Sequence, residues 1–365
     1  MKLFHLLLSI LGLGILTACK KSGYQTKDGS VYYNDYLMRT ADYKSFQELN
    51  DVYASDKSRG YYRGITLDGS NGASFTALDD HYAKDKSTVF YCDNYLDFKL
   101  FETSRKDKIS RIAMADAGSF SVLPNEYARD NFRAYYQGNG FEVMDVASFE
   151  PLDYGYGKDK HTGYFNLKPI TTSSGDSFSV LTRNFSKDKQ HVYYAWTKLD
   201  EAYPPGIRIL KGALPDSFTA VGLYYATDIA SVFYKDRPLK SADPGTFKQW
   251  SESIINYAFD TTHIYFQDKL ILEADKRSFK LISDNYAVDE KAVYFEDHVL
   301  KNGDVASFSV LQAGYAKDNK RVYYEGKVLN GADPLSFTLV SNEADRDAAD
   351  RKQSYHAGHR AKLEK

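Results

Sequence analysis

The reactive side chain that recurs most regularly in this sequence is an aspartate at a nearly constant spacing. It closes the pattern Tyr-Ala-x-Asp, of which residues 315–318 are a clean copy. Repeated carboxylates can bind calcium, but calcium takes six to eight oxygen ligands, and each copy offers one carboxylate, often beside a lysine such as Lys317. An aspartate can instead hold a turn by bonding its own backbone two residues further on. We therefore expect turn aspartates and predict neither a metal nor a cofactor. The ten copies are Asp28, Asp56, Asp85, Asp130, Asp159, Asp188, Asp228, Asp260, Asp289 and Asp318.

A second candidate is the tyrosine-rich segment that follows each aspartate. Val322-Tyr323-Tyr324 is typical, and the middle residue is Tyr or Phe in all ten copies. Tyrosine offers a large rigid ring with a polar tip, so a solvent-facing row of rings could stack on sugars or hold an extended polypeptide. Tyr265, Tyr294 and Tyr323 are then the candidate binding residues. If neighbouring layers cover both faces of this segment, the same rings are core. Continuous apolar runs favour that second interpretation.

The cysteines and histidines show no catalytic or zinc-type spacing. Cys92 follows two aromatic residues on an expected strand, so we expect an inert buried thiol, with a reactive thiol as the alternative. No Gly-x-Ser-x-Gly segment, phosphate-binding loop or His-Glu-x-x-His segment is present in the sequence, and these are the short motifs that most directly indicate catalysis. We predict that the protein is not an enzyme.

The N-terminus has the pattern of an export signal. Lys2 precedes a 14-residue apolar run, and residues 16–19 read Leu-Thr-Ala-Cys. A charged start, an apolar segment and small residues before a cleavage site describe such a signal, and the run is too short to span a bilayer. Residues 16–19 resemble the bacterial lipobox, which implies cleavage before Cys19 and its lipidation. Two or more acyl chains anchor a protein stably, so the lipid bilayer is the expected partner of Cys19. Lys20 and Lys21 follow, which favours the outer membrane if the host has two membranes.

The elements that position these residues repeat with the aspartate. Five of the nine intervals between successive aspartates are 29 residues, and a Ser-Phe or Thr-Phe pair returns in the same register. Longer intervals contain insertions near 97–112 and 200–212, and loops on a repeat scaffold commonly carry the binding surface. A faint eleventh copy surrounds Asp350. Such a period indicates units that are stabilised by stacking on their neighbours.

Each unit is expected to be rich in β-strand. The Tyr-Ala-x-Asp segment, the Val-Tyr-Tyr segment and the residues after the next turn predict three short strands. A single helical turn is expected where an Asp can cap it, as in Asp333-Pro334. The predicted fold is therefore all-β, an open solenoid-like stack of about 29-residue repeats. A closed β-propeller is the alternative, although 29 residues are few for a four-stranded blade of about 40.

Residues 315–324 resemble the DKNYY family, which is named for a repeated Asp-Lys-Asn-Tyr-Tyr-like core. Asp85-Lys86 with Phe90-Tyr91 is a further match, and the resemblance covers roughly residues 24–340. It implies a bacterial, often exported, repeat protein without an assigned biochemical role. The sequence departs from the pattern at Gly60, which replaces the valine, and around Asp350. Those two units are expected to be the least securely paired.

Composition and charge complete the prediction. The chain has 31 Tyr and 22 Phe among 365 residues, and its 47 basic and 49 acidic residues give a net charge of −2. This balance does not indicate the positively charged surface that binds nucleic acid. Charged runs such as Lys84-Asp85-Lys86 are expected at solvated turn tips. We predict a lipoprotein signal peptide at 1–18, lipidated Cys19 with a tether at 19–23, a repeat domain at 24–341, and a polar tail or degraded repeat at 342–365.

The function predicted from these features is that of a membrane-anchored bacterial lipoprotein. It would have a non-enzymatic scaffold or binding role at the cell envelope, with an envelope protein or a glycan as partner. One alternative is a glycan- or peptidoglycan-binding module that uses an exposed tyrosine row. The other is a cell-wall hydrolase with its site on an insertion, which needs paired carboxylates or a Cys–His pair within hydrogen-bond reach.

Overall fold

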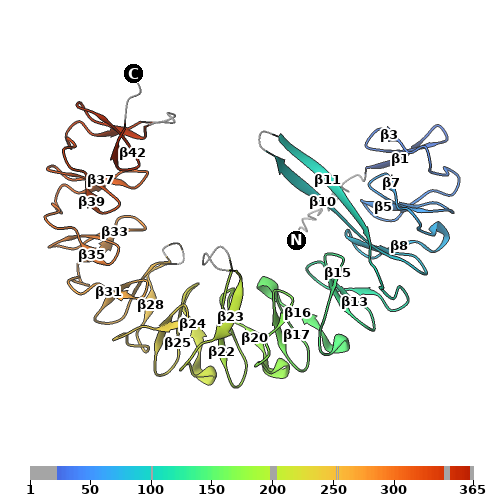
Figure 1. The fold of residues 1–365 in the computed structure, drawn as a ribbon, viewed down its shortest axis with the longest axis horizontal. Coiled ribbons are helices and arrows are strands. Elements are labelled where there is room, and N and C mark those ends of the chain that lie inside the picture. The colour runs from blue at the N-terminus through green and yellow to red at the C-terminus, as the bar shows by residue number, and fades with distance from the viewer. Residues whose placement is uncertain are drawn as a thin grey trace, which may run out of the picture. The chain divides into compact units, whose positions relative to one another are not determined.

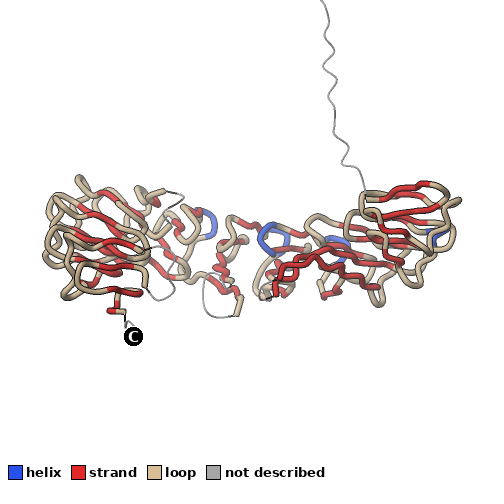
Figure 2. The backbone as a smooth tube through the Cα atoms, turned by 90° about the horizontal axis from the view of Figure 1, so that it is seen from above, coloured by secondary structure: helices blue, strands red, loops and turns tan. Residues whose placement is uncertain are grey.

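The structure is a computed structural model that describes residues 23–99, 102–197, 204–251, 253, 255–340 and 346–361. The export signal and Cys19 lie outside these residues. The described chain consists of short antiparallel strands, and its helices are five 3₁₀ turns of three residues each (Figures 1 and 2). The all-β prediction is confirmed. The chain divides into two units, Met1–Pro151 and Leu152–Lys365, which are described separately.

The first unit contains three complete sheets of four strands and begins with a sheet of three. Consecutive strands pair with one another in chain order, because the connections between them are tight turns. The elements are β1 (Tyr24–Lys27), β2 (Ser30–Tyr33), β3 (Tyr36–Leu37), β4 (Gln47–Glu48), β5 (Tyr53–Ser55), β6 (Gly60–Tyr62), β7 (Ile65–Thr66), η1 (Gly72–Ser74), β8 (Thr76–Ala77), β9 (Tyr82–Lys84), β10 (Val89–Lys99), β11 (Glu102–Arg111), β12 (Ser121–Val122), β13 (Tyr127–Arg129), β14 (Ala134–Tyr136), β15 (Asn139–Phe141), η2 (Val146–Ser148) and β16 (Glu150–Pro151).

The second unit continues the same four-stranded pattern. Its elements are η3 (Asp153–Gly155), β17 (Tyr156–Lys158), β18 (Gly163–Phe165), β19 (Lys168–Pro169), η4 (Gly175–Ser177), β20 (Ser179–Val180), β21 (Phe185–Lys187), β22 (Val192–Trp196), β23 (Gly206–Ile209), η5 (Pro215–Ser217), β24 (Thr219–Ala220), β25 (Tyr225–Thr227), β26 (Val232–Tyr234), β27 (Arg237–Pro238), β28 (Lys248–Gln249), β29 (Tyr257–Phe259), β30 (Ile264–Phe266), β31 (Lys269–Leu270), β32 (Lys280–Leu281), β33 (Tyr286–Val288), β34 (Val293–Phe295), β35 (His298–Val299), β36 (Ser309–Val310), β37 (Tyr315–Lys317), β38 (Val322–Tyr324), β39 (Lys327–Val328), β40 (Thr338–Leu339), β41 (Ala348–Ala349), β42 (Ser354–His356) and β43 (His359–Arg360).

The typical sheet has four strands where three were expected. The additional strand is the pair of residues directly after the Ser-Phe landmark, such as β36, whose Val310 pairs with Ala316 of β37. Two residues are too few to show a period-two pattern, so this strand could not be predicted from the sequence. The strands β40–β43 form an eleventh sheet, which corresponds to the degraded copy around Asp350.

The two insertions lengthen the third and fourth strands of their sheets. The first forms the long hairpin β10–β11, whose register runs from the Phe90–Arg111 pair to the Lys99–Glu102 pair and which extends well beyond the neighbouring strands (Figure 1). The second lengthens β22 and β23, where Trp196 pairs with Gly206. Residues 100–101 and 198–203, at the tips of these insertions, lie outside the described residues.

The core lies between successive sheets. One cluster joins Tyr315 and Val322 of one sheet to Phe337, Ala348 and Tyr355 of the next. The ring of Phe337 lies between the rings of Tyr315 and Tyr355, with centroid distances of 5.3 and 5.4 Å. Within each unit the sheets stack in chain order, and neither unit closes into a barrel or a propeller in the described residues. The open solenoid-like stack is therefore the correct alternative.

The recurring aspartate is buried and holds each repeat together. The Oδ1 atom of Asp318 accepts hydrogen bonds from the backbone N–H groups of Lys320 and Arg321 at 2.7 and 2.6 Å. Its Oδ2 atom accepts one from the hydroxyl of Tyr323 at 2.7 Å and one from the N–H of Asp304 at 3.2 Å. All four donors are recorded for Asp56, Asp130, Asp188, Asp260, Asp289, Asp318 and Asp350. The oxygens are thus occupied by protein donors, as the turn interpretation requires.

The charged runs beside these aspartates are solvated only in part: Lys86 is exposed as expected, whereas the residues before it are not. Asp85 is buried, and the Nζ atom of Lys84 donates to the carbonyl oxygens of Ala117 and Phe120 at 2.8 and 3.0 Å. Lys187 and Lys317 make the same pair of bonds to the following repeat. The lysine before the aspartate therefore links its sheet to the next connection, and the period alone could not show this.

The unit that departs from the common pattern is the first one. Asp28 lies in a two-residue turn between β1 and β2, with positive φ values at Asp28 and Gly29, and it is exposed. The two units expected to be weak are instead complete. Gly60 and the sheet β40–β43 are paired in full. A glycine suits position 60 because an added Cβ would lie 2.5 Å from the ring of Phe75.

The buried aspartates should make the folding stability depend on pH in the acidic range. Burial alone would raise the pKa of Asp260, but the N–H donors of Asp243, Thr262 and His263 and the Tyr265 hydroxyl outweigh it, and the pKa falls to about 2. In the same way the pKa of the equivalent carboxyl groups, among them Asp289 and Asp318, lies below the usual value. Hydrogen bonds to the ionised form are what lower such values.

Acid is therefore expected to unfold the repeats. A folded-state pKa below the unfolded value of about 4 means that the unfolded chain takes up protons first. Stability should be complete above pH about 4 and decline as the pH falls toward about 2, the pKa of Asp260. Urea midpoints measured by circular dichroism between pH 6 and pH 2 test this. An unchanged midpoint over that range would contradict it.

A single substitution tests the carboxylate directly. In Asp318→Asn the amide nitrogen would face two donors, and the free energy of unfolding should fall by about 2–3 kcal/mol because buried polar groups lose their partners. The control is Asp28→Asn, in an exposed turn that suits asparagine, which should change stability by less than about 0.5 kcal/mol. Equal, small losses in both variants in urea unfolding would show that the buried carboxylate is not important.

Candidate binding site

The predicted tyrosine row is not a binding surface. Tyr265, Tyr294 and Tyr323 are 0%, 0% and 1% exposed. Each hydroxyl donates to the aspartate five residues earlier, at 3.1, 2.6 and 2.7 Å. The interpretation of these three residues as exposed binding residues is therefore wrong, because the preceding sheet and the aspartate turn cover them.

The tyrosines of the Tyr-Ala-x-Asp segments face the following sheet. The hydroxyl of Tyr286 accepts a hydrogen bond from the N–H of Gly326 at 3.1 Å. That of Tyr315 accepts one from Gly358 at 2.9 Å and donates to Asp347 at 2.7 Å. Both kinds of tyrosine therefore use their polar tips inside the stack, and both faces of the aromatic strand are covered.

Cys92 is an inert thiol, as expected. It is fully buried among Tyr53, Tyr62 and Phe90. Burial raises the pKa of its thiol to about 12, so the reactive thiolate is not formed near neutral pH. Within the described ranges no three His, Cys, Asp or Glu side chains gather in a way that could hold a metal ion. Cys19, the predicted lipidation site, lies outside the described residues.

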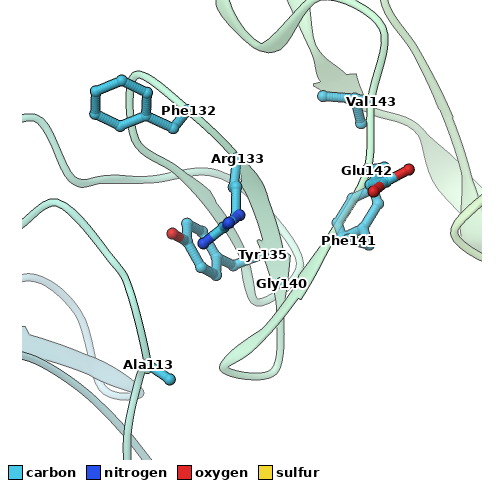
Figure 3. A pocket seen from close by; sticks show the side chains of 8 residues that line it. All are labelled: Ala113, Phe132, Arg133, Tyr135, Gly140, Phe141, Glu142 and Val143. Atoms are coloured by element: carbon cyan, nitrogen blue, oxygen red, sulfur yellow. The ribbon is translucent and has the colours of Figure 1, made fainter.

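A depression of about 480 Å³ lies on the sheet β12–β15 (Figure 3). Its size falls in the range of small ligand sites. One wall comes from the aspartate turn and β14, the other from β15 and the residues after it, and a residue from the preceding connection completes it. The lining residues are Ala113, Phe132, Arg133, Tyr135, Gly140, Phe141, Glu142 and Val143.

The repeats supply an internal comparison that shows what is unusual here. Phe132 is the second residue after the turn aspartate and is 71% exposed. At this position the other repeats with a four-residue turn have polar or small residues. They are Ser58, Ser87, His161, Gln190, Ala230, Thr262, Lys291, Lys320 and Lys352. An exposed phenylalanine has no packing role in the turn, so it is a candidate contact residue.

Gly140 opens the depression. It pairs with Tyr135, as Val328 pairs with Tyr323 in a later sheet. A Cβ atom at Gly140 would meet Tyr135 at 3.5 Å, which is ordinary van der Waals contact. The backbone therefore tolerates a side chain here, and its absence leaves the space beside the Tyr135 ring unfilled.

Two methionines flank the depression in sequence. Met144 follows Val143 and occupies a repeat position that is Ala, Ser or Gly elsewhere; it is 69% exposed. Met114 follows Ala113, is 72% exposed and has φ +61°. Gly69, Gly212 and Gly331 occupy this position with positive φ in other repeats, as do Ser241 and Asn302, whereas Val143 is the equivalent residue of the next repeat. A left-handed conformation costs a non-glycine residue about 1–2 kcal/mol, so an exposed methionine at this position weakens the turn.

The depression presents polar and apolar surface in similar amounts. The side chains of Arg133 and Glu142 come from its two walls (Figure 3), and the remaining lining is mainly aromatic and aliphatic. Flexible methionines and exposed rings can adapt to apolar groups of different shape. The site can therefore receive an apolar side chain and orient it with one charge of either sign. A comparison of the repeats position by position could have found Phe132, Met114 and Met144 in the sequence, but the predictions followed the regular positions.

The model of the DKNYY family matches the chain over residues 11–94, 127–269 and 225–359, which contain the repeated aspartate–tyrosine unit. The chain belongs to the DKNYY family. No curated protein and no solved structure matches the chain. Among the described residues, no helix has the length and apolar character needed to cross a bilayer.

Proposed function

We propose that this protein is a lipid-anchored bacterial envelope protein whose repeat domain has a non-enzymatic binding role. Its partner is a polypeptide that inserts an apolar side chain into the depression beside Gly140. The observation that carries the proposal is the pair of exposed apolar residues at repeat positions that are small or polar elsewhere, namely Phe132 and Met144, together with the unfilled space at Gly140.

The anchoring part rests on the N-terminal sequence. Residues 16–19 have the lipobox pattern, and Cys19 would carry the acyl chains. The family match includes residues from position 11 onward, so the signal segment and the first repeat are matched together. If the host has two membranes, Lys20 and Lys21 favour the outer one.

The chemistry of the depression supports a polypeptide over a glycan. Glycan sites need several hydrogen-bonding groups beside a flat aromatic face, because sugars carry many hydroxyls that lose water on binding. Here Arg133 and Glu142 are the charged lining residues, whereas Phe132, Phe141 and Val143 offer apolar surface. The tyrosine row that favoured glycans is buried.

The hydrolase alternative receives no specific support. A hydrolase with a Cys–His pair would need Cys92 as its nucleophile, but this thiol is buried and protonated near neutral pH. Seven of the turn aspartates accept hydrogen bonds from four donors, as Asp318 does, and they hold the fold. The depression contains one carboxylate, Glu142, among its lining residues. A general acid–base pair would need a second group within hydrogen-bond reach.

Photo-crosslinking in cells tests the binding role. A benzoyl-phenylalanine at Phe132 should give a discrete adduct of higher mass, whereas the same group at Ile229, an exposed apolar residue in the equivalent turn of another sheet, should not. Gly140→Val fills the depression with the residue found at Val328 and should abolish the adduct without unfolding the sheet. Adducts of equal yield at both sites, or one that persists in Gly140→Val, would contradict the proposed site.

The anchor is tested by phase separation. The native protein should enter the detergent phase of a temperature-induced separation, and Cys19→Ser should stay in the aqueous phase because it lacks acyl chains. Mass spectrometry of the N-terminal peptide gives a second readout. A Cys19→Ser chain that still enters the detergent phase would overturn the lipoprotein assignment.

A further inference from the structure

The first sheet of the chain has a face that no other sheet covers among the described residues. Gln25 pairs with Tyr32, and Tyr32 pairs with Leu37. Residues directly opposite each other in paired strands share a face, so these three side chains form one row across β1–β3. The next sheet covers the other face, where the hydroxyl of Tyr24 bonds the carbonyl oxygen of Val52.

This uncovered row is more apolar than the end of a repeat array needs to be. Terminal repeats usually present a polar outer face to keep the protein soluble. Here Leu37 is 49% exposed, and Tyr32 is half-buried, whereas its equivalent Tyr61 is fully buried by the sheet before it. The row therefore has the apolar character of a surface that is normally covered.

The distance to Cys19 identifies what can cover it. Four residues separate Cys19 from Gly23, and β1 begins at Tyr24. An extended chain spans at most about 3.6 Å per residue, so the tether reaches no more than about 14 Å. If Cys19 is acylated, the start of β1 stays within about 14 Å of it, so β1–β3 remain close to the headgroup layer. Tyrosine is enriched at this depth because its ring is apolar and its tip is polar.

Basic side chains accompany the row. Lys27 and Arg39 are exposed on the first repeat, and Lys20 and Lys21 lie in the tether. Lysine and arginine near an anionic surface each contribute about 1 kcal/mol of attraction. Asp28 and Asp35 are exposed as well, so charge adds to the contact without dominating it.

We propose that the outer face of the first sheet, formed by Gln25, Tyr32 and Leu37, rests on the headgroup layer of the membrane that holds Cys19. This contact rests on the proposed lipid anchor and adds an orientation to it. The sheet lies against the bilayer, and the following repeats lead away from it. The short tether holds this face close to the bilayer, so the bilayer is the surface that we expect to cover it.

A fluorescent label on position 37 tests the contact. In Leu37→Cys the label reacts with the new thiol, because Cys92 is fully buried and Cys19 is acylated. The control is Val328→Cys, at the same repeat position and 42% exposed against 49% for Leu37. The acylated protein is placed in vesicles of phosphatidylethanolamine and phosphatidylglycerol that contain lipids with a nitroxide on the headgroup. Quenching at position 37 should be at least about twofold greater than at position 328, since headgroup contact places the label beside the nitroxide.

The outcomes separate this inference from the anchor. If mass spectrometry shows acylated Cys19 and the label at position 37 is quenched no more than the one at 328, the contact is overturned and the anchor stands. If Cys19 carries no acyl chain, both fall. If the label in a soluble Cys19→Ser, Leu37→Cys chain becomes shielded as protein concentration rises, a second copy covers this face, and the membrane contact is likewise overturned.

Discussion

A buried carboxylate that accepts four hydrogen bonds is the interaction on which the rest of the structure depends. In the repeat of Asp318 it fixes the turn through Lys320 and Arg321, the aromatic strand through Tyr323, and the incoming connection through Asp304. Burying an ionised group is costly unless donors replace its water. The repeats with a buried aspartate meet that requirement with their own donors, and the neighbouring sheets then exclude solvent from the arrangement. This explains why a unit of about 29 residues with few core side chains is ordered only within a stack.

The same interaction decides where function can reside. The buried turn aspartates accept hydrogen bonds from the protein, and the buried repeat tyrosines described above bond to these aspartates or to the next sheet. These polar groups are therefore not offered to a ligand. Specific chemistry is therefore expected where a repeat differs from the others. Phe132, Gly140 and Met144 differ in one sheet, and Tyr32 and Leu37 are uncovered in the first. The regular repeats hold these exceptions in place.

The architecture could be predicted from the sequence because a period is a global signal. The 29-residue spacing, the aromatic strands and the open stack of sheets were all visible. The first strand of each sheet was not, because Ser309–Val310 is too short to show alternation. Nor was the role of Lys84, whose partners lie more than 30 residues away in the next repeat. Of the two interpretations of the tyrosine row, the favoured one, buried rings, is correct and the exposed row is wrong; composition alone cannot show which face a neighbouring sheet covers. Phe132 was visible in principle, by comparison of the repeats, since it breaks a pattern that the chain itself defines.

The central claim is that the tyrosines are structural, and their ionisation tests it most directly. Burial is the main cause that raises the pKa of Tyr323 to about 12, and the hydrogen bond from its hydroxyl to Asp318 is the second. Burial likewise raises the pKa of Tyr127 to about 12. Phenol absorbance and circular dichroism should be followed together during alkaline titration. The account predicts that most of the absorbance change occurs only at about pH 12 or above, together with loss of the β-sheet signal. If most of it is complete by about pH 11, one unit above the ordinary tyrosine value, with the β-sheet signal intact, the rings are accessible and the account is wrong.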